Sequence, residues 1–341
     1  MIFFDSTKTG RQGHRSGLMR VSERLSRALG EAATQVVWNR WDRSGLSRQD
    51  WFVTAELFSE TERPGFWDFL RSRLCRTAAI FHDAIPLKHP AITWPQSIAR
   101  HPEYMKMLAS FDRVWAVSQA SRDELLGFWR WQGIENPPQV DVLALGADFN
   151  EAPRATRPPT TPPTPPALLC VGILEPRKNQ TLLLDVCPLL WDEGLAFELH
   201  FAGRVNPHFG KPIAQRLRTL GRKYPQLHYH EDLGDQTLAA LYSSLRATVF
   251  PTLAEGCGLP LLESLWRGVP CVCSDLPVLM ENARGGACLA TPANDPSAWQ
   301  NALRLIVSDD SLWQRLASEA AQRPLPTWAE AAATIRTSLS A

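Results

Sequence analysis

Two glutamates eight residues apart, Glu255 and Glu263, lie in a segment rich in glycine and proline. The segment reads as a buried strand, a glycine-bracketed loop, and a helix that begins at Pro260 and stops at Gly268. Carboxylates accept hydrogen bonds from vicinal hydroxyls, so the pair suits a sugar on one side and a ribose on the other. The free amides and positive dipole end of the helix favour a phosphate at the same place. A structural explanation also fits, in which Glu263 complements the helix dipole and Glu255 is a solvated loop residue.

A second polar cluster lies upstream, in the run Ala-Leu-Leu-Cys-Val-Gly-Ile-Leu-Glu-Pro-Arg-Lys-Asn-Gln of residues 167–180. It reads as the first strand of the second half, then a turn that closes on Arg177 and Lys178, with Asn179 at a helix N-cap position. Two adjacent cations at the carboxyl end of a strand, beside a helix N-terminus, form a strong cradle for a diphosphate. The alternative is an ordinary solvated turn.

Several common nucleotide-binding and catalytic motifs are absent from the sequence. The only Gly-Lys pair, Gly210-Lys211, lacks the rest of a P-loop, and no Gly-x-Gly-x-x-Gly follows the first strand of either half. No Gly-x-Ser-x-Gly elbow occurs, and no Asp-x-Asp pair of the kind that clamps a metal-bound nucleotide. The formal net charge is +1, so we expect no nucleic-acid partner, and we assign no metal-binding residues.

The elements that must position these residues are visible in the hydrophobic pattern. With 341 residues, 44% of them apolar, the chain is long enough for two domains with sizeable cores. Short apolar runs alternate with segments of helical periodicity, which predicts two α/β domains with doubly wound, parallel, Rossmann-like sheets. Ligands bind beyond the carboxyl ends of the strands in such sheets. The expected strands are 2–4, 35–38, 78–81, 113–117, 140–143, 167–173, 197–202, 227–229, 248–250 and 270–273, and the expected helices are 18–29, 96–110, 120–131, 180–190, 212–223, 237–245 and 260–267.

The clearest change of composition is at residues 152–166, where prolines alternate with threonine and arginine. Proline lacks an amide donor and fixes φ, so this stretch can neither continue a helix nor lie inside a sheet. It reads as an extended linker. We therefore predict a first domain over residues 1–151, the linker over 152–166, a second domain over 167–326, and an amphipathic terminal helix over 327–341.

The seven cysteines are widely spaced and mostly lie in apolar runs, which is typical of reduced, buried thiols. No Cys-x-x-Cys pair occurs, so the usual spacing of a structural zinc site is missing. The carboxylate of Asp5 comes too early for the apolar core of a signal peptide, and no run approaches the ~18 apolar residues of a membrane-spanning helix. We therefore expect a cytoplasmic protein.

Three motifs together carry a family resemblance. They are the Glu-x7-Glu segment 255–263 with its Gly-x-Gly-Leu-Pro, the Gly-x-Leu-Glu-Pro-Arg-Lys-Asn turn of residues 172–179, and Leu-Ala-Ala-Leu-Tyr at residues 238–242. In this combination the chain resembles the retaining, nucleotide-sugar-dependent glycosyltransferases of family 4, the group 1 transferases. The first half resembles them more loosely, at residues 17–20, 80–90 and 114–126. The resemblance implies the GT-B fold, in which an acceptor-side domain and a nucleotide-sugar-binding domain face a cleft.

The resemblance also implies roles for individual residues. Lys178 and Arg177 would bind the donor diphosphate, Glu255 and the amides of residues 256–259 would meet the sugar, and Glu263 would hold the ribose. Ile173 stands where many members have an arginine, so that phosphate contact is either missing or supplied by Arg204. The expected catalytic residues are His82, Lys178 and Glu255, and the expected donor contacts are Gly17, Arg177, Lys178, Arg204, Gly256, Cys257, Gly258, Leu259 and Glu263.

The roles of His82 and of the loop of residues 10–17 have alternative explanations. His82 also fits as a strand-end histidine bonded to a backbone carbonyl, and we interpret His200, His228 and His230 as structural. The loop of residues 10–17 is longer and more basic than the family's usual glycine turn, which leaves its approach to the phosphates open.

The predicted reaction is transfer of a hexose from a nucleoside diphosphate sugar, with retention and with no metal or other cofactor. GDP-mannose is our first choice of donor, and a glycan or polyprenyl-linked hydroxyl in bacterial surface-polysaccharide synthesis is the expected acceptor. A nucleotide-sugar epimerase and a non-catalytic binding subunit of the same fold are the alternatives.

A lipid-linked acceptor would bring the protein to the inner face of the membrane as a peripheral protein. Residues 1–27 carry an excess of basic side chains, and residues 64–76 mix aromatics with arginines. We predict that this face meets an anionic membrane surface. Solvated helix charges and buried aromatics explain the same residues equally well.

Overall fold

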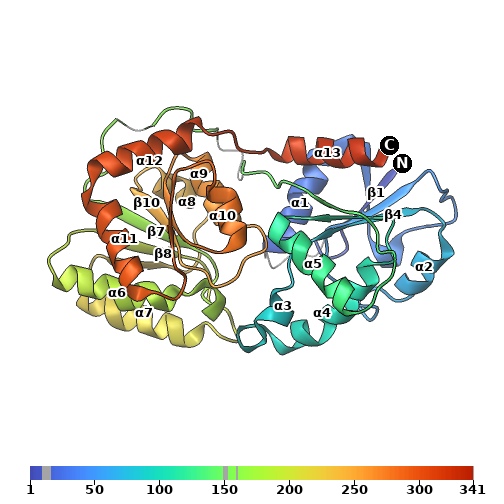
Figure 1. The fold of residues 1–341 in the computed structure, drawn as a ribbon, viewed down its shortest axis with the longest axis horizontal. Helices are drawn as coiled ribbons and strands as arrows, with labels where there is room; N and C mark the ends of the chain where they lie inside the picture. Colours follow the sequence, from blue (N-terminus) through green and yellow to red (C-terminus); the bar gives the residue numbers. More distant parts are fainter. Residues whose placement is uncertain (10–16, 149–152, 159, 341) are drawn as a thin grey trace. The chain divides into compact units, whose positions relative to one another are not determined.

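The computed structural model describes residues 1–9, 17–148, 153–158 and 160–340. Its contacts divide the chain into two compact units, Met1–Gly146 with Pro326–Ala341, and Ala147–Leu325 (Figure 1). We call them unit 1 and unit 2. The predicted boundary between residues 151 and 152 lies outside the described residues, and the linker role of 152–166 stays a prediction.

Unit 1 is built on a six-stranded parallel sheet with strand order β2-β1-β3-β4-β5-β6. The expected strands are confirmed to within three residues, and one buried strand, Trp51–Thr54, was missed because it is short and follows a polar stretch. The strands are β1 Ile2–Asp5, β2 Ala33–Val36, β3 Trp51–Thr54, β4 Arg76–Phe81, β5 Arg113–Ala116 and β6 Val140–Val142, and the helices are α1 Gly17–Leu29, α2 Phe66–Ser72, α3 Ile85–Lys88, α4 Pro95–Leu108, α5 Gln119–Trp131 and α13 Trp328–Ser340.

The last helix, α13, belongs to unit 1 although it is the most distant element in sequence. It packs beside α1, as Figure 1 shows, and buries the apolar side chains of Trp328, Ile335 and Leu339. The indole Nε1 of Trp51 donates a hydrogen bond of 2.9 Å to the Leu339 carbonyl. The helix prediction for residues 327–341 is thus confirmed, and the structure supplies the docking partner that the sequence did not indicate.

Aromatic side chains fill the core of unit 1 around Trp38. Its ring lies 4.9 Å from Phe66 and 5.3 Å from Phe69, centroid to centroid, and both phenylalanines are buried. Edge-to-face and tilted contacts of this kind stabilise a core beyond the area they bury. The aromatics of residues 64–76 that lie on α2 therefore pack inward, and only the arginines of that segment remain as candidates for a membrane-facing surface.

Unit 2 contains a second six-stranded parallel sheet, with order β12-β11-β10-β7-β8-β9. The expected elements are confirmed, and β12 with the three helices α10 to α12 extends beyond them. The strands are β7 Ala167–Val171, β8 Glu198–Ala202, β9 Leu227–His230, β10 Ala247–Phe250, β11 Cys271–Ser274 and β12 Cys288–Thr291, and the helices are α6 Gln180–Asp192, α7 Lys211–Lys223, α8 Asp235–Tyr242, α9 Leu259–Trp266, α10 Pro277–Ala283, α11 Pro296–Ser308 and α12 Asp310–Gln322.

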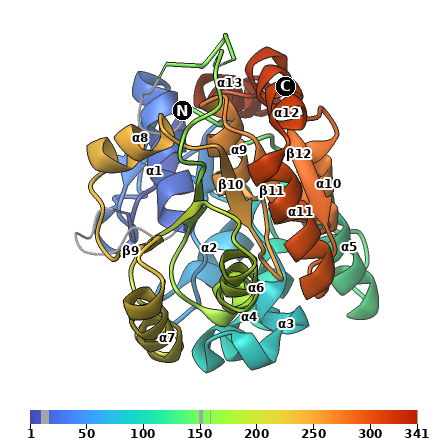
Figure 2. The same cartoon turned by 90° about the vertical axis from the view of Figure 1, so that its left-hand side faces the viewer.

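The two faces of this sheet are covered by different helices. One core joins Leu199 and Phe201 of β8 to α6, α7, α11 and α12. The other face, with Ala202 of β8, packs against Leu238 and Tyr242 of α8, which lies across the sheet from α11 in Figure 2. Six of the seven cysteines are buried, as the sequence predicted. Among the described residues, every helix is too short or too polar to cross a membrane.

Candidate functional site

The polar motifs of the second half meet at the topological switch point of unit 2. β7 and β10 are neighbours in the sheet, while β8 follows β7 on its other side. Connections that leave two neighbouring strands in opposite directions open a crevice at their carboxyl ends. The 3₁₀ turn Pro176–Lys178 follows β7, and the loop before α9 follows β10. The amide of Leu253 donates to the Arg177 carbonyl, at 2.8 Å, and holds the two loops together.

Lys178, Arg177 and Glu255 form a compact ion cluster in this crevice. One carboxylate oxygen, Glu255 Oε1, lies 2.5 Å from Lys178 Nζ and 3.0 Å from Arg177 Nη1. The same oxygen accepts a 2.9 Å hydrogen bond from Thr252 Oγ1. Glu175 forms a second ion pair with Arg177, at 2.8 Å. The side chains of Lys178 and Glu255 are 10% and 9% exposed, so neither a solvated loop nor a solvated turn describes them.

The electrostatics of the cluster favour a further anion. Burial alone would raise the pKa of Glu255, but the charges of Lys178 and Arg177, with hydrogen bonds from Lys178 and Thr252, outweigh it and lower the pKa below its usual value. Burial also lowers the pKa of Lys178, and the neighbouring guanidinium acts in the same direction, so that Glu255 compensates only in part. Lys178 and Arg177 share the ionised Glu255, and Glu175 pairs with Arg177 as well. A phosphate beside Lys178 would stabilise its charge, which burial and Arg177 disfavour.

Glycines permit the close approach of the strand ends here. Gly203, which follows β8, has φ +153°, and a Cβ on it would lie 2.1 Å from the Gly172 carbonyl oxygen. Asn179 is the N-cap residue of α6, as predicted, but it does not cap with its side chain. Its backbone is left-handed, φ 53°, because it closes the preceding 3₁₀ turn, and its Nδ2 donates to the Ala293 carbonyl at 3.4 Å.

The helix after the loop has the predicted form. Gly258 is the left-handed N-cap of α9, Pro260 lies in the first turn, and Gly268, φ +73°, follows the C-cap. Glu263 lies one turn inside and is buried, with Arg267 Nη2 at 3.9 Å from its Oε1. The thiol of Cys257 in the loop is also buried, which raises its pKa to about 12.

Nothing in the structure tests the two remaining predicted donor contacts, Arg204 and Gly17. Arg204 is exposed, and its carbonyl accepts from the Leu174 amide at 2.9 Å. Gly17 begins α1 in unit 1, while residues 10–16 of the loop before it lie outside the described residues. For Arg204 and Gly17 a role in donor binding stays a prediction.

His82 follows β4 in unit 1 and is buried. Its Nε2 lies 2.8 Å from the Ala55 carbonyl oxygen, as the structural explanation requires. A carbonyl only accepts, so Nε2 carries the proton, and burial lowers the pKa of the ring and keeps it neutral. The lone pair is then on Nδ1. His82 can therefore accept a hydrogen bond from a hydroxyl but is not an acid at neutral pH.

The sequence analysis missed a second ion cluster, at the switch point of unit 1. Asp5 ends β1 and Glu56 follows β3, and Nη2 of Arg63 lies 2.9 Å from Asp5 Oδ2 and 2.5 Å from Glu56 Oε2. All three side chains are at most 3% exposed. Glu56 also accepts hydrogen bonds from the amides of Lys8 and Thr9. A carboxylate at the end of the first strand was a usable signal, but its partners lie about 50 residues away in sequence.

Residues 153–323, half of the chain, match the family model described as "Glycosyl transferases group 1". The serotype-specific mannosyltransferase WbdA of Escherichia coli is 29% identical over 245 residues, 68% of this chain but only 30% of WbdA. The O-antigen chain mannosyltransferase B of Escherichia coli is 28% identical over 257 residues, 73% of this chain and 66% of that protein. The chain therefore spans less than a third of the length of WbdA.

The structural comparison covers the whole chain. The crystal structure of Anabaena Alr3699/HepE, in complex with UDP and glucose, superposes with a TM-score of 0.72 at 14% identity, over 99% of both chains. A likeness at this level of identity concerns the fold and confirms the expected GT-B architecture of two Rossmann-like units. Together with the family match, it confirms the resemblance read from the three motifs. The chain belongs to the glycosyl transferases group 1 family.

Proposed function

We propose that the protein transfers a hexose from a nucleoside diphosphate sugar to an acceptor hydroxyl. The observation that carries this proposal is the buried cluster of Lys178, Arg177 and Glu255 at the switch point of unit 2. Lys178 has three N–H donors and gives one to Glu255, while Arg177 donates to Glu175, to Glu255 and to the Ala254 carbonyl. Lys178 can therefore bind a diphosphate, beside the charge of Arg177, while Glu255 stays in place to meet the sugar.

The same cluster explains how transfer would be accelerated. Negative charge grows on the diphosphate as the bond from the anomeric carbon to the phosphate oxygen breaks. Buried, pre-oriented cations stabilise that charge more in the transition state than in the ground state. Lys178 and Arg177 are held by Glu255 and Glu175 before any donor arrives, so little reorganisation is needed. In this proposal they do the work that a metal ion does elsewhere, and the reaction needs none.

We propose retention at the anomeric carbon. The acceptor oxygen forms its bond on the face from which the diphosphate leaves, and the acceptor proton passes to the departing diphosphate oxygen. No carboxylate of the chain acts as a nucleophile in this scheme. Glu263 holds the ribose, and the neutral ring of His82 accepts a hydrogen bond from a sugar hydroxyl.

GDP-mannose is the proposed donor, because WbdA and the O-antigen chain mannosyltransferase B are both named as mannosyltransferases. The name of the second supports a glycan acceptor. The test is a thermal-shift series with GDP, UDP, ADP and dTDP, followed by transfer from labelled GDP-mannose to a polyprenyl-linked glycan. A ligand at 100 times its dissociation constant stabilises the fold by about 2.7 kcal/mol. Stabilisation by GDP above the others, and an α-linked product by NMR, are the expected results.

Other outcomes of that experiment would change the proposal. If none of the four nucleotides stabilises the protein, the proposed donor site is wrong. Release of a free epimerised sugar without acceptor would point to an epimerase, and tight nucleotide binding without turnover to a non-catalytic subunit.

We further propose that a lipid-linked acceptor is reached from an anionic membrane surface. Arg20, Arg24 and Arg27 supply the basic charge among the described residues 1–9 and 17–27, because the fourth basic side chain there, Lys8, is paired with Glu62. Sedimentation with neutral and anionic liposomes at low salt tests this directly. Stronger binding to anionic vesicles is expected, and equal binding to both would contradict it.

A further inference from the structure

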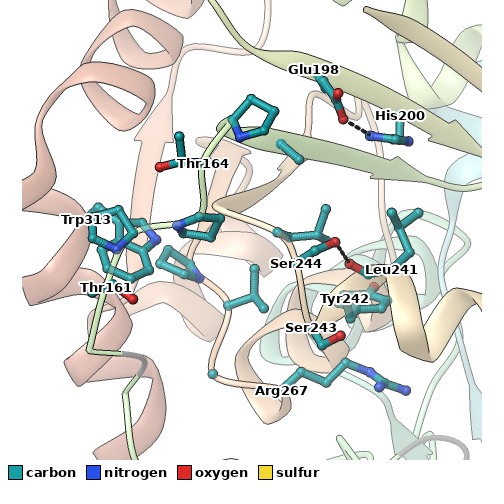
Figure 3. Close-up of a pocket in the computed structure, with 18 residues that line it drawn as sticks. Thr161, Thr164, Glu198, His200, Leu241, Tyr242, Ser243, Ser244, Arg267 and Trp313 are labelled. Atoms are coloured by element: carbon teal, nitrogen blue, oxygen red, sulfur yellow. Dashed lines mark hydrogen bonds and ion pairs between the residues drawn. The ribbon is translucent and has the colours of Figure 1, made fainter.

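A cavity of about 510 Å³ lies at the amino edge of the sheet in unit 2, opposite to the ion cluster. Its walls include Ala167 and Glu198, the first residues of β7 and β8, and Pro270, which directly precedes β11. Figure 3 shows Glu198 and His200 at one side of the cavity and Arg267 at the other. The proposed transfer reaction uses only the carboxyl edge of this sheet, so the cavity is not explained by it.

Four side chains of metal-ligating types line up along β8 and β9, and two of them, Glu198 and His200, line this cavity. Side chains alternate between the faces of a strand, so Glu198 and His200 share one face, and His228 and His230 share the same face of the next strand. The register pairs His200 directly with His228. Leu199 between the β8 pair is fully buried in the core on the opposite face. The backbone that carries the ligand atoms is thus fixed by core packing.

The ligand atoms of Glu198, His200 and His228 all lie within 4.8 Å of one another. Glu198 Oε2 lies 3.2 Å from His200 Nε2. This equals the distance between two ligand atoms in a tetrahedral site whose metal–ligand bonds are about 2.0 Å long. The rings of His200 and His228 stack with centroids 4.5 Å apart. A ring nitrogen of His228 thus lies near the same centre.

His230 completes the arrangement from the other side of His200. Its Nε2 lies 3.1 Å from His200 Nδ1. If His200 Nε2 faces the centre, its Nδ1 carries the proton and donates it to His230, which fixes the tautomer and ring orientation that a metal ligand needs.

We propose that Glu198, His200 and His228 bind a divalent transition-metal ion of the zinc type, with the fourth position open to the cavity. Two imidazoles and one carboxylate suit Zn²⁺, and nitrogen ligands disfavour Mg²⁺ and Ca²⁺. Glu198 is 38% exposed, so an ion can enter from the cavity side. The bound ion would tie the edge strand β9 to β8. Because the site is at the amino edge, its role is in the stability of unit 2 and not in the transfer step.

The test uses the full-length protein, dialysed against chelator and titrated with Zn²⁺ and, in parallel, with Mg²⁺. Calorimetry should give one equivalent of Zn²⁺ and none of Mg²⁺, and Co²⁺ should give the visible absorption of a tetrahedral centre. Zn²⁺ at 100 times its dissociation constant should raise Tm by about 5–10 °C.

Variants identify the ligands. His228→Ala and Glu198→Gln, whose side chains are only partly buried, should lower Zn²⁺ affinity more than ~100-fold, and His230→Gln by ~10–100-fold. His208→Ala, at an exposed histidine outside the cluster, should leave affinity unchanged. Zn²⁺ binding that survives in both ligand variants, or a wild-type protein that binds no Zn²⁺, would overturn the proposal and leave the row of histidines as a hydrogen-bonded structural feature.

Discussion

Both units carry an ion cluster at the switch point of their sheet, and the two clusters differ in their balance of charge. In unit 1, Asp5 and Glu56 share the guanidinium of Arg63. In unit 2, Lys178 and Arg177 share one oxygen of Glu255. The first cluster has two carboxylates for one cation, whereas the second has two cations balanced by Glu255 and by Glu175, which pairs with Arg177.

The balance of cations and carboxylates determines what each cluster can bind. Glu56 uses its remaining acceptor capacity on the amides of Lys8 and Thr9, so the cluster of unit 1 anchors its own chain. Lys178 of unit 2 has N–H donors beyond its bond to Glu255, which suits an external anion. The same topological position therefore serves loop anchoring in one unit and, in our proposal, phosphate binding in the other, and the side-chain charges decide between the two.

The largest effect is expected on breaking the cluster of unit 1. Arg63→Met leaves two carboxylates buried without their cation, which costs about 3–5 kcal/mol of the free energy of unfolding. Arg71→Met is the matched control, because Arg71 pairs with Asp68 at the exposed surface, where a pair contributes ~0–1 kcal/mol. Denaturant unfolding measures both. Equal stability of the two variants would mean that the cluster is not needed for the fold.

The corresponding change in unit 2 should affect catalysis. Lys178→Ala removes a cation that faces growing charge, so turnover should fall by ~10²–10³-fold, together with weaker donor binding. Lys211→Ala, at an exposed lysine at the start of α7, is the control. Steady-state kinetics with the labelled donor measure the effect. A Lys178→Ala enzyme with wild-type turnover would mean that the diphosphate binds elsewhere.

The two glutamates of unit 2 should separate by kinetic role. Glu263→Ala removes hydrogen bonds to the ribose, so it should weaken donor and free nucleotide alike, by ~10–100-fold. Glu255→Ala should keep nucleotide affinity and lose transfer, because Glu255 meets the sugar. Calorimetry with the nucleotide and transfer kinetics distinguish the two. If both folded variants transfer at the wild-type rate, the pair is structural.

Opposite pH slopes should distinguish Glu56 from Glu255. Burial and the nearby Asp5 raise the pKa of Glu56, so its contribution to stability is present below about pH 4.5 and is lost as pH rises through the folded pKa. The pKa of Glu255 is lowered, so its contribution is present above about pH 4.5 and is lost as pH falls through the folded pKa. Relative to the wild type, the Glu56→Gln variant should therefore have a higher free energy of unfolding at neutral than at acidic pH. The Glu255→Gln variant, again relative to the wild type, should have a lower free energy of unfolding at neutral than at acidic pH. Unfolding free energies at several pH values measure both slopes, and parallel slopes would contradict the comparison.

No change in turnover is expected after exhaustive chelation, because the cations of unit 2 offset the charge of the diphosphate. The comparison is turnover before and after dialysis against chelator, at a temperature where the chelated protein is folded. A loss of activity that only Mg²⁺ or Mn²⁺ restores would show that the phosphate site is wrongly assigned.

The candidate site in unit 2 was predictable because its signals are local. Glycine, proline and charged residues directly follow β7 and β10, and the strand order brings these two turns together. The cluster of unit 1 was not predictable in the same way. Arg63 reaches Asp5 from 58 positions away, and nothing in the sequence around either residue indicates the pair.

Backbone details and long-range docking also escaped the sequence analysis. The left-handed turn at Asn179 depends on the 3₁₀ turn before it, which local propensity does not specify. The strand Trp51–Thr54 has buried residues on both faces and therefore no alternation to recognise. Its Trp51 meets Leu339, a partner 288 positions later, which only the folded chain reveals.

The position of α13 has a consequence for the order in which the protein folds during synthesis. Translation proceeds from the N-terminus, and domains that are continuous in sequence can fold as they emerge from the ribosome. Unit 2 has all its residues once Leu325 has emerged. Unit 1, which is synthesised first, lacks the helix that covers α1 until residues 328–340 have been made. The first unit to be translated is thus the last to be completed, and its nascent sheet must wait for its final helix while the second unit folds.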